Sequence, residues 1–600
     1  MSYEIKKTKN INERNNKKMK LMKRMISAIA AVVMVMMIGT MVFAAENPPK
    51  VTIRKQDDSN DKSAHSYEFY QIFSVKVDDN DDLYDIEWGT GVQEPDAAFY
   101  TALKALEGFS SCNDRDALLT VLEEANKNND TELVDRFATF IAGKTVASDN
   151  SNVVKATIGA SDTLKEDIEL TSGMGYYLVK DTITSSPVVD GAQSKFMLMV
   201  VNKNTSITIY TKEVVPSLDK NIVVGSTEQK YNQASVGDEI TFKLSSKVPD
   251  LTNKGYNKYC FVMNDTLSEG LDYIGTSASD NKPVITVGSK TLTADDYEFT
   301  YNSTTNSIEI VFKDFLNYGI DDAFIGKDIT VTYKACLNEK ADTTDAGNPN
   351  TASLTYSNDP SHTYNSDKPG DGDVTGKSPD IQTVTYTTGA KLKKIDKDGN
   401  PLVGAEFHVE GTQSKQVIVT KTEYEVSATG TFYKLKDGTY TDTVPTSETQ
   451  NKYDSTDTKY APVERDSVIV ENIDATDTTI EVDDNGELVL TGLGEGTYTI
   501  KETKAPDGYT LDKTPHTIEI TFSYDSTNKK PVWTYKIDDT TTTVANGEQY
   551  VVLEVVNKKT SLLPETGGIG TVGFYVAGAV LLAAGAALAV LKKKSEADRA

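Results

Sequence analysis

The residues with the clearest chemical role stand near the end of the sequence, in the stretch SLLPETGGIG at 561–570. A mostly apolar run follows at 571–591, and Lys592, Lys593 and Lys594 come directly after it. An apolar run of this length can cross a bilayer as a helix, and lysines just beyond it hold the tail in the cytoplasm. The pattern predicts a stop-transfer handle that leaves the preceding peptide outside the membrane.

That peptide is Leu563, Pro564, Glu565, Thr566 and Gly567. Together with the apolar run and the basic tail, in this order, it resembles the cell-wall sorting signal of Gram-positive surface proteins. The resemblance implies that a membrane sortase cuts between Thr566 and Gly567 through a cysteine thioacyl intermediate and passes Thr566 to an amine. We therefore expect sortase and peptidoglycan as partners of a secreted chain that is anchored in the cell wall.

A candidate acceptor amine, Lys212, stands in the stretch ITIYTKE at 207–213. The stretch resembles the Tyr-Pro-Lys motif of pilins, whose lysine attacks the acyl-enzyme of the next subunit, although Thr211 replaces the proline and no tryptophan precedes it. The alternative is a solvated structural lysine. The position at the end of the expected first domain favours the linkage role.

The second region resembles the isopeptide-forming middle domain of Gram-positive fimbrial shaft proteins, through VPSLDKNI, ASVGDEITFKL, VMNDTLSEGLDYIG and NPNTASLTYSND. In that family a lysine of the first strand attacks an asparagine of a late strand, assisted by a buried carboxylic acid. Matched residue by residue, the resemblance implies Lys220, Asn350 and Asp265. The alternative is that these are ordinary exposed strand residues.

The third region resembles the B-type repeat of collagen adhesins and pilins, through KKIDKDGNPLVGAEF, YTIKETKAPDGY and VVNKK. The resemblance implies a second set of reacting residues, Lys394, Glu502 and Asn557. The middle segment departs from the family pattern only by Ile500 in place of leucine.

Such chemistry needs burial. An amine attacks an amide only when it is unprotonated, and an apolar environment lowers the pKa of a lysine. The same environment raises the pKa of a carboxylic acid, so Asp265 or Glu502 can stay protonated and hydrogen-bond the asparagine carbonyl as its oxygen becomes negative. Folding then holds the amine against the amide carbon, which can remove roughly 7–11 kcal/mol from the barrier.

Other candidate sites are weaker. Lys55, Asp181 and Asn202 of the first region have a loosely similar order but poor spacing for a third cross-link. The stretch 396–400 begins like a calcium loop, but its glycine is displaced and a hairpin turn fits it better.

Histidines and cysteines support no conventional site. The four histidines are scattered, which supports neither a zinc site nor a Ser-His triad, and we expect no metal or other cofactor. Three cysteines are too few for a disulfide framework in an exported protein of this size. Cys260 and Cys336 either pair with each other or are buried free thiols.

The N-terminal segment and the net charge of the chain indicate where the protein resides and which partners it lacks. Basic residues up to Arg24 precede an apolar run at 25–43, which ends in small residues at Ala44. This is typical of a secretory signal peptide, and a retained membrane anchor is the alternative. The chain has 62 Lys and Arg against 89 Asp and Glu, a net charge of −27, which argues against a nucleic-acid partner.

The organisation is mainly β. Short alternating strands predict tandem immunoglobulin-like (collagen-adhesin type) β-sandwich domains, and apolar residues at helical spacing between Asp96 and Lys144 predict a small helical insertion in the first. The expected parts are a signal peptide at 1–44, an N-terminal pilin domain at 45–213, an isopeptide-forming middle domain at 214–360, a linker at 361–380, a collagen-adhesin B-type domain at 381–560 and the sorting signal at 561–600.

Over nearly its whole length the sequence resembles the shaft subunit of a sortase-assembled pilus. This implies a structural protein, not an enzyme, whose partners include identical subunits in a fibre, minor pilins and a host surface ligand. The alternative is a monomeric wall-anchored adhesin or a minor pilin that binds a host ligand.

Overall fold

The computed structural model describes residues 48–56, 60–77, 83–201, 207–276, 281–411, 417–436, 438–445, 458–464, 468–470 and 479–560. The expected signal peptide, sorting signal and C-terminal membrane span lie outside these residues. Within the described ranges, no helix is long and apolar enough to cross a membrane. The chain forms two compact units, one ending at Tyr386 and one beginning at Thr387, and the short segments 233–237 and 343–345 belong to the second.

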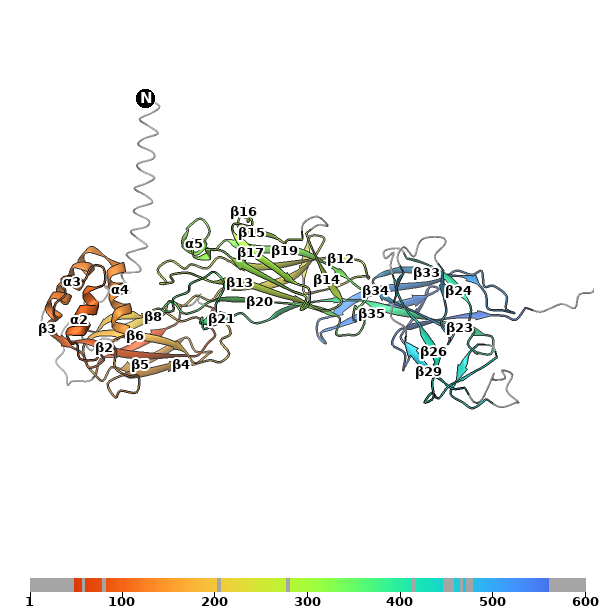
Figure 1. Ribbon diagram of the computed structural model, residues 1–600, viewed down its shortest axis with the longest axis horizontal. Helices are drawn as coiled ribbons and strands as arrows, with labels where there is room; N and C mark the ends of the chain where they lie inside the picture. Colours follow the sequence, from red (N-terminus) through yellow and green to blue (C-terminus); the bar gives the residue numbers. More distant parts are fainter. Residues whose placement is uncertain are drawn as a thin grey trace, which may run out of the picture. The chain divides into compact units, whose positions relative to one another are not determined.

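The first unit starts with a domain of two sheets, which we call the first domain (Figure 1). One sheet has the strand order β5-β1-β8, and the other has the order β3-β2-β6-β7 with β4 beside β2. Strands β1 and β8 pair in parallel, so the beginning and the end of this domain lie side by side. The strands are β1 (Lys50–Arg54), β2 (His65–Val77), β3 (Leu83–Trp88), β4 (Val154–Ile158), β5 (Leu164–Glu169), β6 (Gly175–Ile183), β7 (Met197–Val201) and β8 (Ile207–Tyr210).

The helical insertion predicted from periodicity is confirmed. Each of its helices begins after an aspartate whose side chain accepts a hydrogen bond from a first-turn backbone N–H, the usual N-cap arrangement. The helices lie over one side of the β2 sheet (Figure 1). They are α2 (Ala97–Lys104), α3 (Arg115–Asn128) and α4 (Thr131–Ala142).

Strand β2 explains how this domain holds together. Side chains alternate between the two faces of a strand. Tyr67 and Phe69 therefore belong to the core between the sheets, whereas Tyr70 and Ile72 belong to the core beneath the helices. Both faces of β2 are therefore covered, one by the second sheet and the other by the helices.

The middle domain, from β9 to β22, is a sandwich of two seven-stranded sheets. One sheet has the order β10-β9-β12-β19-β15-β16 with β14 beside β19, and the other has the order β11-β22-β20-β13-β18-β17 with β21 beside β20. The elements are β9 (Asp219–Val224), β10 (Thr227–Gln229), β11 (Tyr231–Gln233), β12 (Glu239–Lys247), β13 (Phe261–Leu267), β14 (Leu271–Gly275), β15 (Val284–Val287), β16 (Lys290–Thr291), β17 (Tyr297–Asn302), β18 (Ser307–Phe312), α5 (Phe315–Ile320), β19 (Asp328–Leu337), β20 (Asn348–Ser357), β21 (Thr375–Lys377) and β22 (Ile381–Tyr386).

The expected linker at 361–380 is wrong, because this segment belongs to the middle domain. Tyr364 is buried, and its hydroxyl donates to the carbonyl of Val374 and accepts the backbone N–H of Asn358. Strands β21 and β22 then pair with β20. One buried aromatic side chain and backbone pairing hold a segment whose polar composition indicated a loop.

The second unit is a sandwich that we call the third domain. Its sheets have the orders β30-β25-β32-β23-β37 and β31-β24-β33-β34-β35-β36. The first strand, β23, pairs in parallel with the last, β37, so both ends of the domain lie next to each other. The strands are β23 (Thr388–Asp396), β24 (Glu406–Gly411), β25 (Val417–Thr420), β30 (Val468–Val470), β31 (Ile480–Glu481), β32 (Glu487–Leu493), β33 (Gly496–Lys504), β34 (His516–Asp525), β35 (Lys530–Ile537), β36 (Thr540–Thr542) and β37 (Val551–Asn557).

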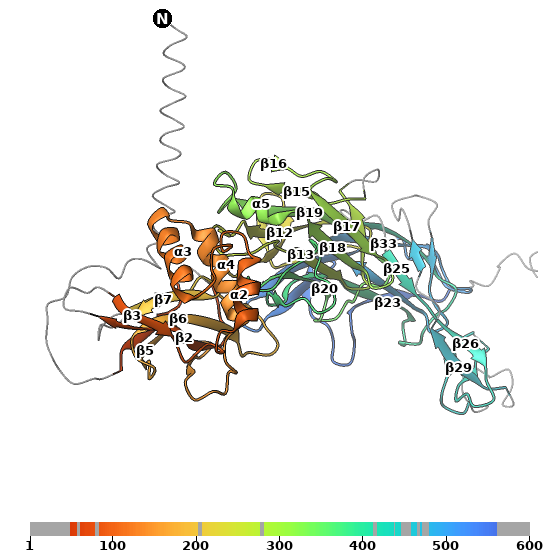
Figure 2. The same cartoon turned by 60° about the vertical axis from the view of Figure 1, so that its left-hand side comes forward.

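Two small hairpin-like pairs stand beside this sandwich, and Figure 2 shows β26 and β29 projecting from it as an arm. Their aromatic rings pack on one another, with Tyr424 and Tyr440 stacked at a centroid distance of 4.2 Å. The strands are β26 (Thr422–Val426), β27 (Tyr433–Lys434), β28 (Tyr440–Thr441) and β29 (Tyr460–Glu464).

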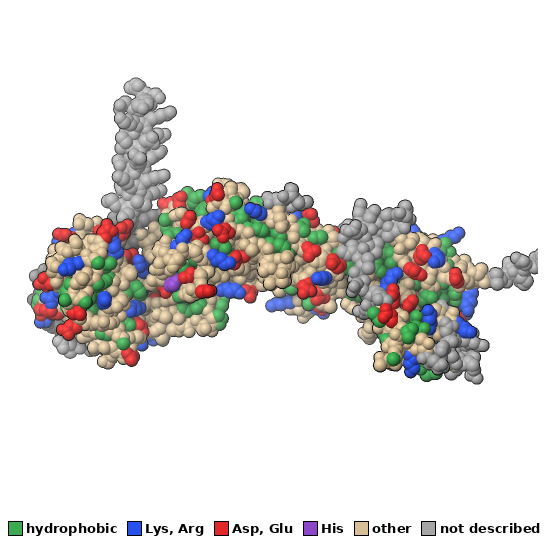
Figure 3. Space-filling model, viewed as in Figure 1, with side chains coloured by type: hydrophobic (Ala, Val, Ile, Leu, Met, Phe, Trp, Pro, Cys, Tyr) green, Lys and Arg blue, Asp and Glu red, His purple; other side chains and the backbone are tan. Residues whose placement is uncertain are grey.

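The charged surface is mixed. On the face of the first unit seen in Figure 3, acidic and basic side chains are interspersed. Exposed pairs such as Lys368 with Glu309 and Lys334 with Glu239 are of a kind that contributes at most about 1 kcal/mol each. Most of the stability of the domains must therefore come from their hydrophobic cores and from buried polar contacts.

Candidate functional site

The middle domain brings Lys220, Asp265 and Asn350 together in its core. Lys220 lies on β9 in one sheet, and Asp265 and Asn350 lie on the neighbouring strands β13 and β20 of the other. Lys220 Nζ donates to Asp265 Oδ2 at 2.5 Å. The hydroxyl of Tyr333, on β19, accepts from Lys220 Nζ at 3.0 Å and from Asn350 Nδ2 at 2.7 Å.

These polar side chains are buried because they occupy inward positions of alternating strands. On β9 the buried positions are Lys220 and Ile222, and on β20 they include Asn350, Ala352 and Leu354. A lysine at such a position has its amine in the core instead of in water.

Burial also sets the protonation of the pair. Loss of solvent lowers the pKa of the Lys220 amine, against the opposing attraction of Asp265. The same loss of solvent raises the pKa of Asp265, although Lys220 and Tyr333 work against it. Both shifts favour the neutral amine and the neutral acid. Within the described part of the chain, Oδ1 of Asp265 and Oδ1 of Asn350 have no hydrogen-bond partner.

The third domain brings together Lys394, Glu502 and Asn557. Lys394 follows Ala390 and Leu392 on the inward face of β23, and Asn557 ends the inward row of the parallel neighbour β37. Lys394 Nζ donates to Asn557 Oδ1 at 2.5 Å. Glu502 comes from β33 in the facing sheet.

The acid of this second triad is held directly against the amide. Asn557 Nδ2 donates to both carboxylate oxygens of Glu502, at 2.8 and 3.1 Å, and Lys394 Nζ lies 3.5 Å from Oε1. The backbone N–H of Asp512 donates to the other oxygen at 2.6 Å and orients the carboxyl group. Burial lowers the pKa of Lys394, although the charge of Glu502 opposes that shift.

Lys212 lies just after β8, the edge strand beside β1. Its backbone N–H donates to the hydroxyl of Ser194 at 2.8 Å, and its side chain is half-buried. Burial lowers the pKa of the Lys212 amine, a shift that the charge of Asp135 opposes and that of Lys195 increases. A lower pKa leaves a larger fraction of the amine neutral and nucleophilic.

The structure explains why Thr211 stands where the motif has proline. The backbone N–H of Thr211 donates to the carbonyl of Arg54 at 3.0 Å, and its hydroxyl donates to Glu213 at 2.6 Å. Proline has no N–H and could not make the first bond. The segment that carries Lys212 is thus tied to β1 by backbone pairing.

The loosely matched set in the first domain is arranged differently. Lys55 Nζ donates to Asp61 Oδ1 at 3.0 Å and to the carbonyl of Ser63. Asp181 instead bonds His65 Nδ1 at 2.7 Å, and His65 Nε2 bonds Asp61. Asn202 lies outside the described residues. The buried groups form an ion network, in which the carboxylates of Asp181 and Asp61 flank His65.

This network predicts a pH-dependent first domain. Burial alone would lower the pKa of His65, but Asp181 and Asp61 outweigh it and raise the pKa to about 9. Stability from this raised pKa is fully present below the unfolded value of about 6.5 and is lost as pH rises through 9, a change of roughly 3 kcal/mol. Urea unfolding followed by Trp88 fluorescence, with Trp533 replaced by phenylalanine, measures it. His65→Gln should remove the slope, and an equal slope in that variant would contradict the assignment.

Comparison with known proteins shows what the chain is similar to. Residues 451–531 match the model of the SpaA prealbumin-like fold domain, and residues 555–597 match the LPXTG cell wall anchor motif. The chain is 27% identical over 401 residues to the trypsin-resistant surface T6 protein of Streptococcus pyogenes, covering 64% of this chain and 70% of that protein. The chain carries the LPXTG cell wall anchor motif and is similar to Gram-positive pilin-type subunits. It is also 25% identical over 356 residues to fimbrial subunit type 2 of Actinomyces naeslundii, covering 56% of this chain and 58% of that protein.

Among solved structures, the T6 backbone pilin of Streptococcus pyogenes aligns with a TM-score of 0.44 and 16% identity, covering 86% of this chain and 94% of that one. The expected mainly β class of tandem β-sandwich domains is confirmed by the sheets of the structure itself. The chain is a structural protein, not an enzyme.

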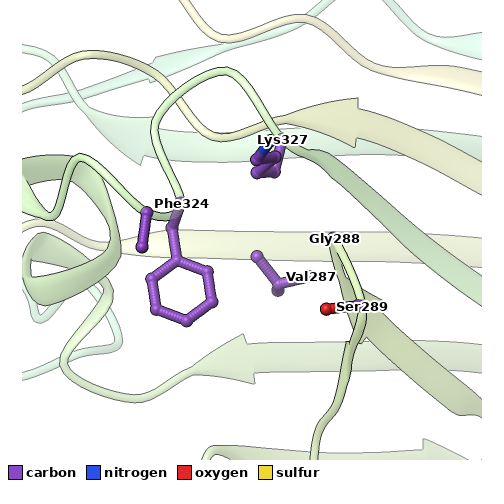
Figure 4. A pocket seen from close by; sticks show the side chains of 6 residues that line it. Val287, Gly288, Ser289, Phe324 and Lys327 are labelled. Atoms are coloured by element: carbon purple, nitrogen blue, oxygen red, sulfur yellow. The ribbon is translucent and has the colours of Figure 1, made fainter.

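The middle domain also has a pocket that lies apart from the triads and is partly lined by apolar side chains. It lies in the middle domain at the β15–β16 turn, with Phe324 and Val287 facing into it and one lysine at its edge (Figure 4). It shares no residue with either triad. The lining residues are Val287, Gly288, Ser289, Ala323, Phe324 and Lys327.

The remaining candidates resolve simply. Asp396 accepts the backbone N–H groups of Asp398 and Asn400 in a tight turn, as the hairpin interpretation of that stretch expects. Cys260 and Cys336 are free thiols, the first buried and the second half-buried. In the described ranges, no group of histidine, cysteine and acidic residues could hold a metal ion. His65 and His516 each pair with aspartates, and so does His362.

Sequence reasoning missed Tyr333 and the pair of Asp61 and His65. Tyr333 is one of 30 tyrosines, and its stretch, DITVTYKACL, is an ordinary alternating strand. Asp61 lies in a loop before β2. Only the folded arrangement places these residues beside the reacting groups or the buried histidine.

Proposed function

We propose that this pilin subunit is the shaft subunit of a covalent pilus. Sortase cuts the Thr566–Gly567 bond and holds Thr566 as a thioester on its cysteine. It then transfers Thr566 to the Nζ amine of Lys212 in the next subunit, which regenerates the sortase thiol. Repetition gives an open head-to-tail fibre. The LPXTG anchor motif and the lowered pKa of Lys212 support this linkage.

We also propose two amide bonds within each subunit, Lys220 to Asn350 and Lys394 to Asn557. The observation that carries this proposal is the burial of each lysine together with an asparagine and an acid. Lys394 Nζ lies 2.5 Å from Asn557 Oδ1, whereas Lys220 Nζ and Asn350 Nδ2 both bond the hydroxyl of Tyr333. In each bond the lysine amine replaces the amide nitrogen of asparagine, which leaves as ammonia. Each site reacts once.

The bonds lie where force would act. Lys394 is on the first strand of the third domain and Asn557 on the last, and these strands are parallel neighbours. Tension between the ends of the domain would shear β23 against β37. A covalent link across that pair would carry the load in place of its hydrogen bonds. In the middle domain the link would join the two sheets.

The mass of the folded chain tests the two bonds. The mature chain, isolated whole, should weigh less than its sequence by two ammonias, because each condensation releases one. Digestion should yield two branched peptides, one containing Lys220 and Asn350 and the other containing Lys394 and Asn557. Well-folded protein with the full sequence mass would refute both cross-links.

A further inference from the structure

Tyr333 stands at the centre of the middle-domain triad. Its hydroxyl donates to Asp265 Oδ2 at 2.5 Å while it accepts from Lys220 Nζ at 3.0 Å and from Asn350 Nδ2 at 2.7 Å. This hydroxyl oxygen therefore contacts the attacking nitrogen, the acid and the departing nitrogen together. The side chain is fully buried, as are Lys220 and Asn350.

The surroundings keep the phenol neutral. Burial raises the pKa of Tyr333 well above its ordinary value, and the nearby Asp265 adds to this. The ring stacks on Phe242 at a centroid distance of 5.5 Å, which fixes the direction of the hydroxyl. A neutral phenol can donate one proton and accept another at the same oxygen.

The condensation requires both of those transfers. When the lysine amine attacks the amide carbon, the attacking nitrogen carries one proton too many. The departing nitrogen loses its amide resonance, gains a basic lone pair, and needs one proton to leave as ammonia. Because the site is buried, these transfers must pass through side chains.

We propose that Tyr333 is a further catalytic residue of the middle domain, relaying a proton from Nζ of Lys220 to Nδ2 of Asn350. The inference rests on the proposed Lys220–Asn350 bond. Once the departing nitrogen has gained its lone pair, the O–H of Tyr333 turns to it from Asp265 and gives it the phenol proton. The phenol oxygen takes the surplus proton of the attacking nitrogen in exchange. The new C–N bond forms, the old one breaks, ammonia leaves, and the phenol is unchanged.

The third domain shows why only one of the two sites needs such a relay. There the carboxyl group of Glu502 bonds the nitrogen of Asn557 directly. In the middle domain the hydroxyl of Tyr333 stands between the carboxyl group of Asp265 and the nitrogen of Asn350. The phenol extends the reach of the shorter aspartate side chain.

Tyr333→Phe tests the relay. Loss of general acid–base catalysis costs about 10²–10⁴-fold, so the middle-domain bond should form at least about 100-fold more slowly in this variant. Newly translated full chain is sampled over time, digested, and assayed by mass spectrometry for the branched Lys220–Asn350 peptide. The branched Lys394–Asn557 peptide of the same chain is an internal control and should form at the wild-type rate.

A matched control removes a neighbouring buried hydroxyl. Tyr273 packs against Tyr333, and its hydroxyl donates to the carbonyl of Asn281. Tyr273→Phe should leave the rate of the middle-domain bond unchanged. A singly fluorinated tyrosine at position 333 keeps the hydroxyl but lowers the pKa of the phenol, so a relay predicts an altered pH–rate profile.

The outcomes are distinguishable. If the wild-type chain never forms the Lys220–Asn350 peptide, the proposed cross-link itself fails. If the wild type forms it and Tyr333→Phe forms it equally fast, only the role of Tyr333 is refuted. An unchanged pH–rate profile with fluorinated tyrosine would also overturn the relay, because a merely structural hydroxyl is insensitive to that change.

Discussion

Glu502→Ala should give a chain that lacks one ammonia instead of two, with the third domain left uncrosslinked. Glu502 contacts both the amine of Lys394 and the amide of Asn557, so its removal takes away the group that polarises the amide. The lost bond closes a loop between residues 163 positions apart. By analogy with a disulfide, its absence should lower the free energy of unfolding by about 5 kcal/mol.

Two measurements check this result. Intact mass reports the missing condensation, and limited proteolysis should cut the third domain while the middle domain stays resistant. Glu519→Ala is the matched control, since Glu519 lies on the neighbouring strand β34 and only pairs with Lys536 at the surface. A Glu502→Ala chain that still lacks two ammonias would show that the acid is dispensable.

Asp265→Ala is the corresponding change in the middle domain, and it should remove only the middle-domain bond. The Lys220–Asn350 peptide should disappear while the Lys394–Asn557 peptide remains. The variant also leaves a buried lysine without its acid, so destabilisation alone does not demonstrate a lost bond. The peptide masses separate the two effects.

The two triads could be predicted from the sequence because the stretches around them resemble isopeptide-forming domains. Lys394 interrupts an inward row of apolar side chains, and Asn557 ends one. Such a charged or amide residue at an inward position is costly unless it is paired, and the structure supplies a partner for each. The helical insertion was also predictable, from apolar residues at helical spacing.

Other features could not be read from the sequence because they depend on contacts between distant segments. The segment around Tyr364 has the composition of a linker, and only its docking against Asn257 and Asn358 makes it part of the middle domain. The buried pairing of His65 with Asp181 joins residues 116 positions apart. A local sequence pattern cannot reveal partners that are so far apart in the chain.

Lys212→Arg should abolish the ladder of covalent multimers that a pilin sortase produces from the wild-type chain. Arginine preserves the length and positive charge of the side chain, but its guanidinium group stays protonated and cannot attack the thioester of the acyl-enzyme. Burial acts on Lys212 in the opposite sense, because it lowers the pKa of the amine. Denaturing gel electrophoresis after coexpression with the sortase measures the ladder.

The control is Lys62→Arg, which changes an exposed lysine of the same domain that pairs with Asp190. It should leave the ladder unchanged, and both variants should keep the two internal cross-links by mass. Those bonds involve other lysines, so a Lys212→Arg chain that has lost only the ladder is folded and specifically defective in linkage. A ladder that persists in this variant would exclude Lys212 as the acceptor and direct attention to Lys195, the neighbouring lysine whose charge acts on Lys212.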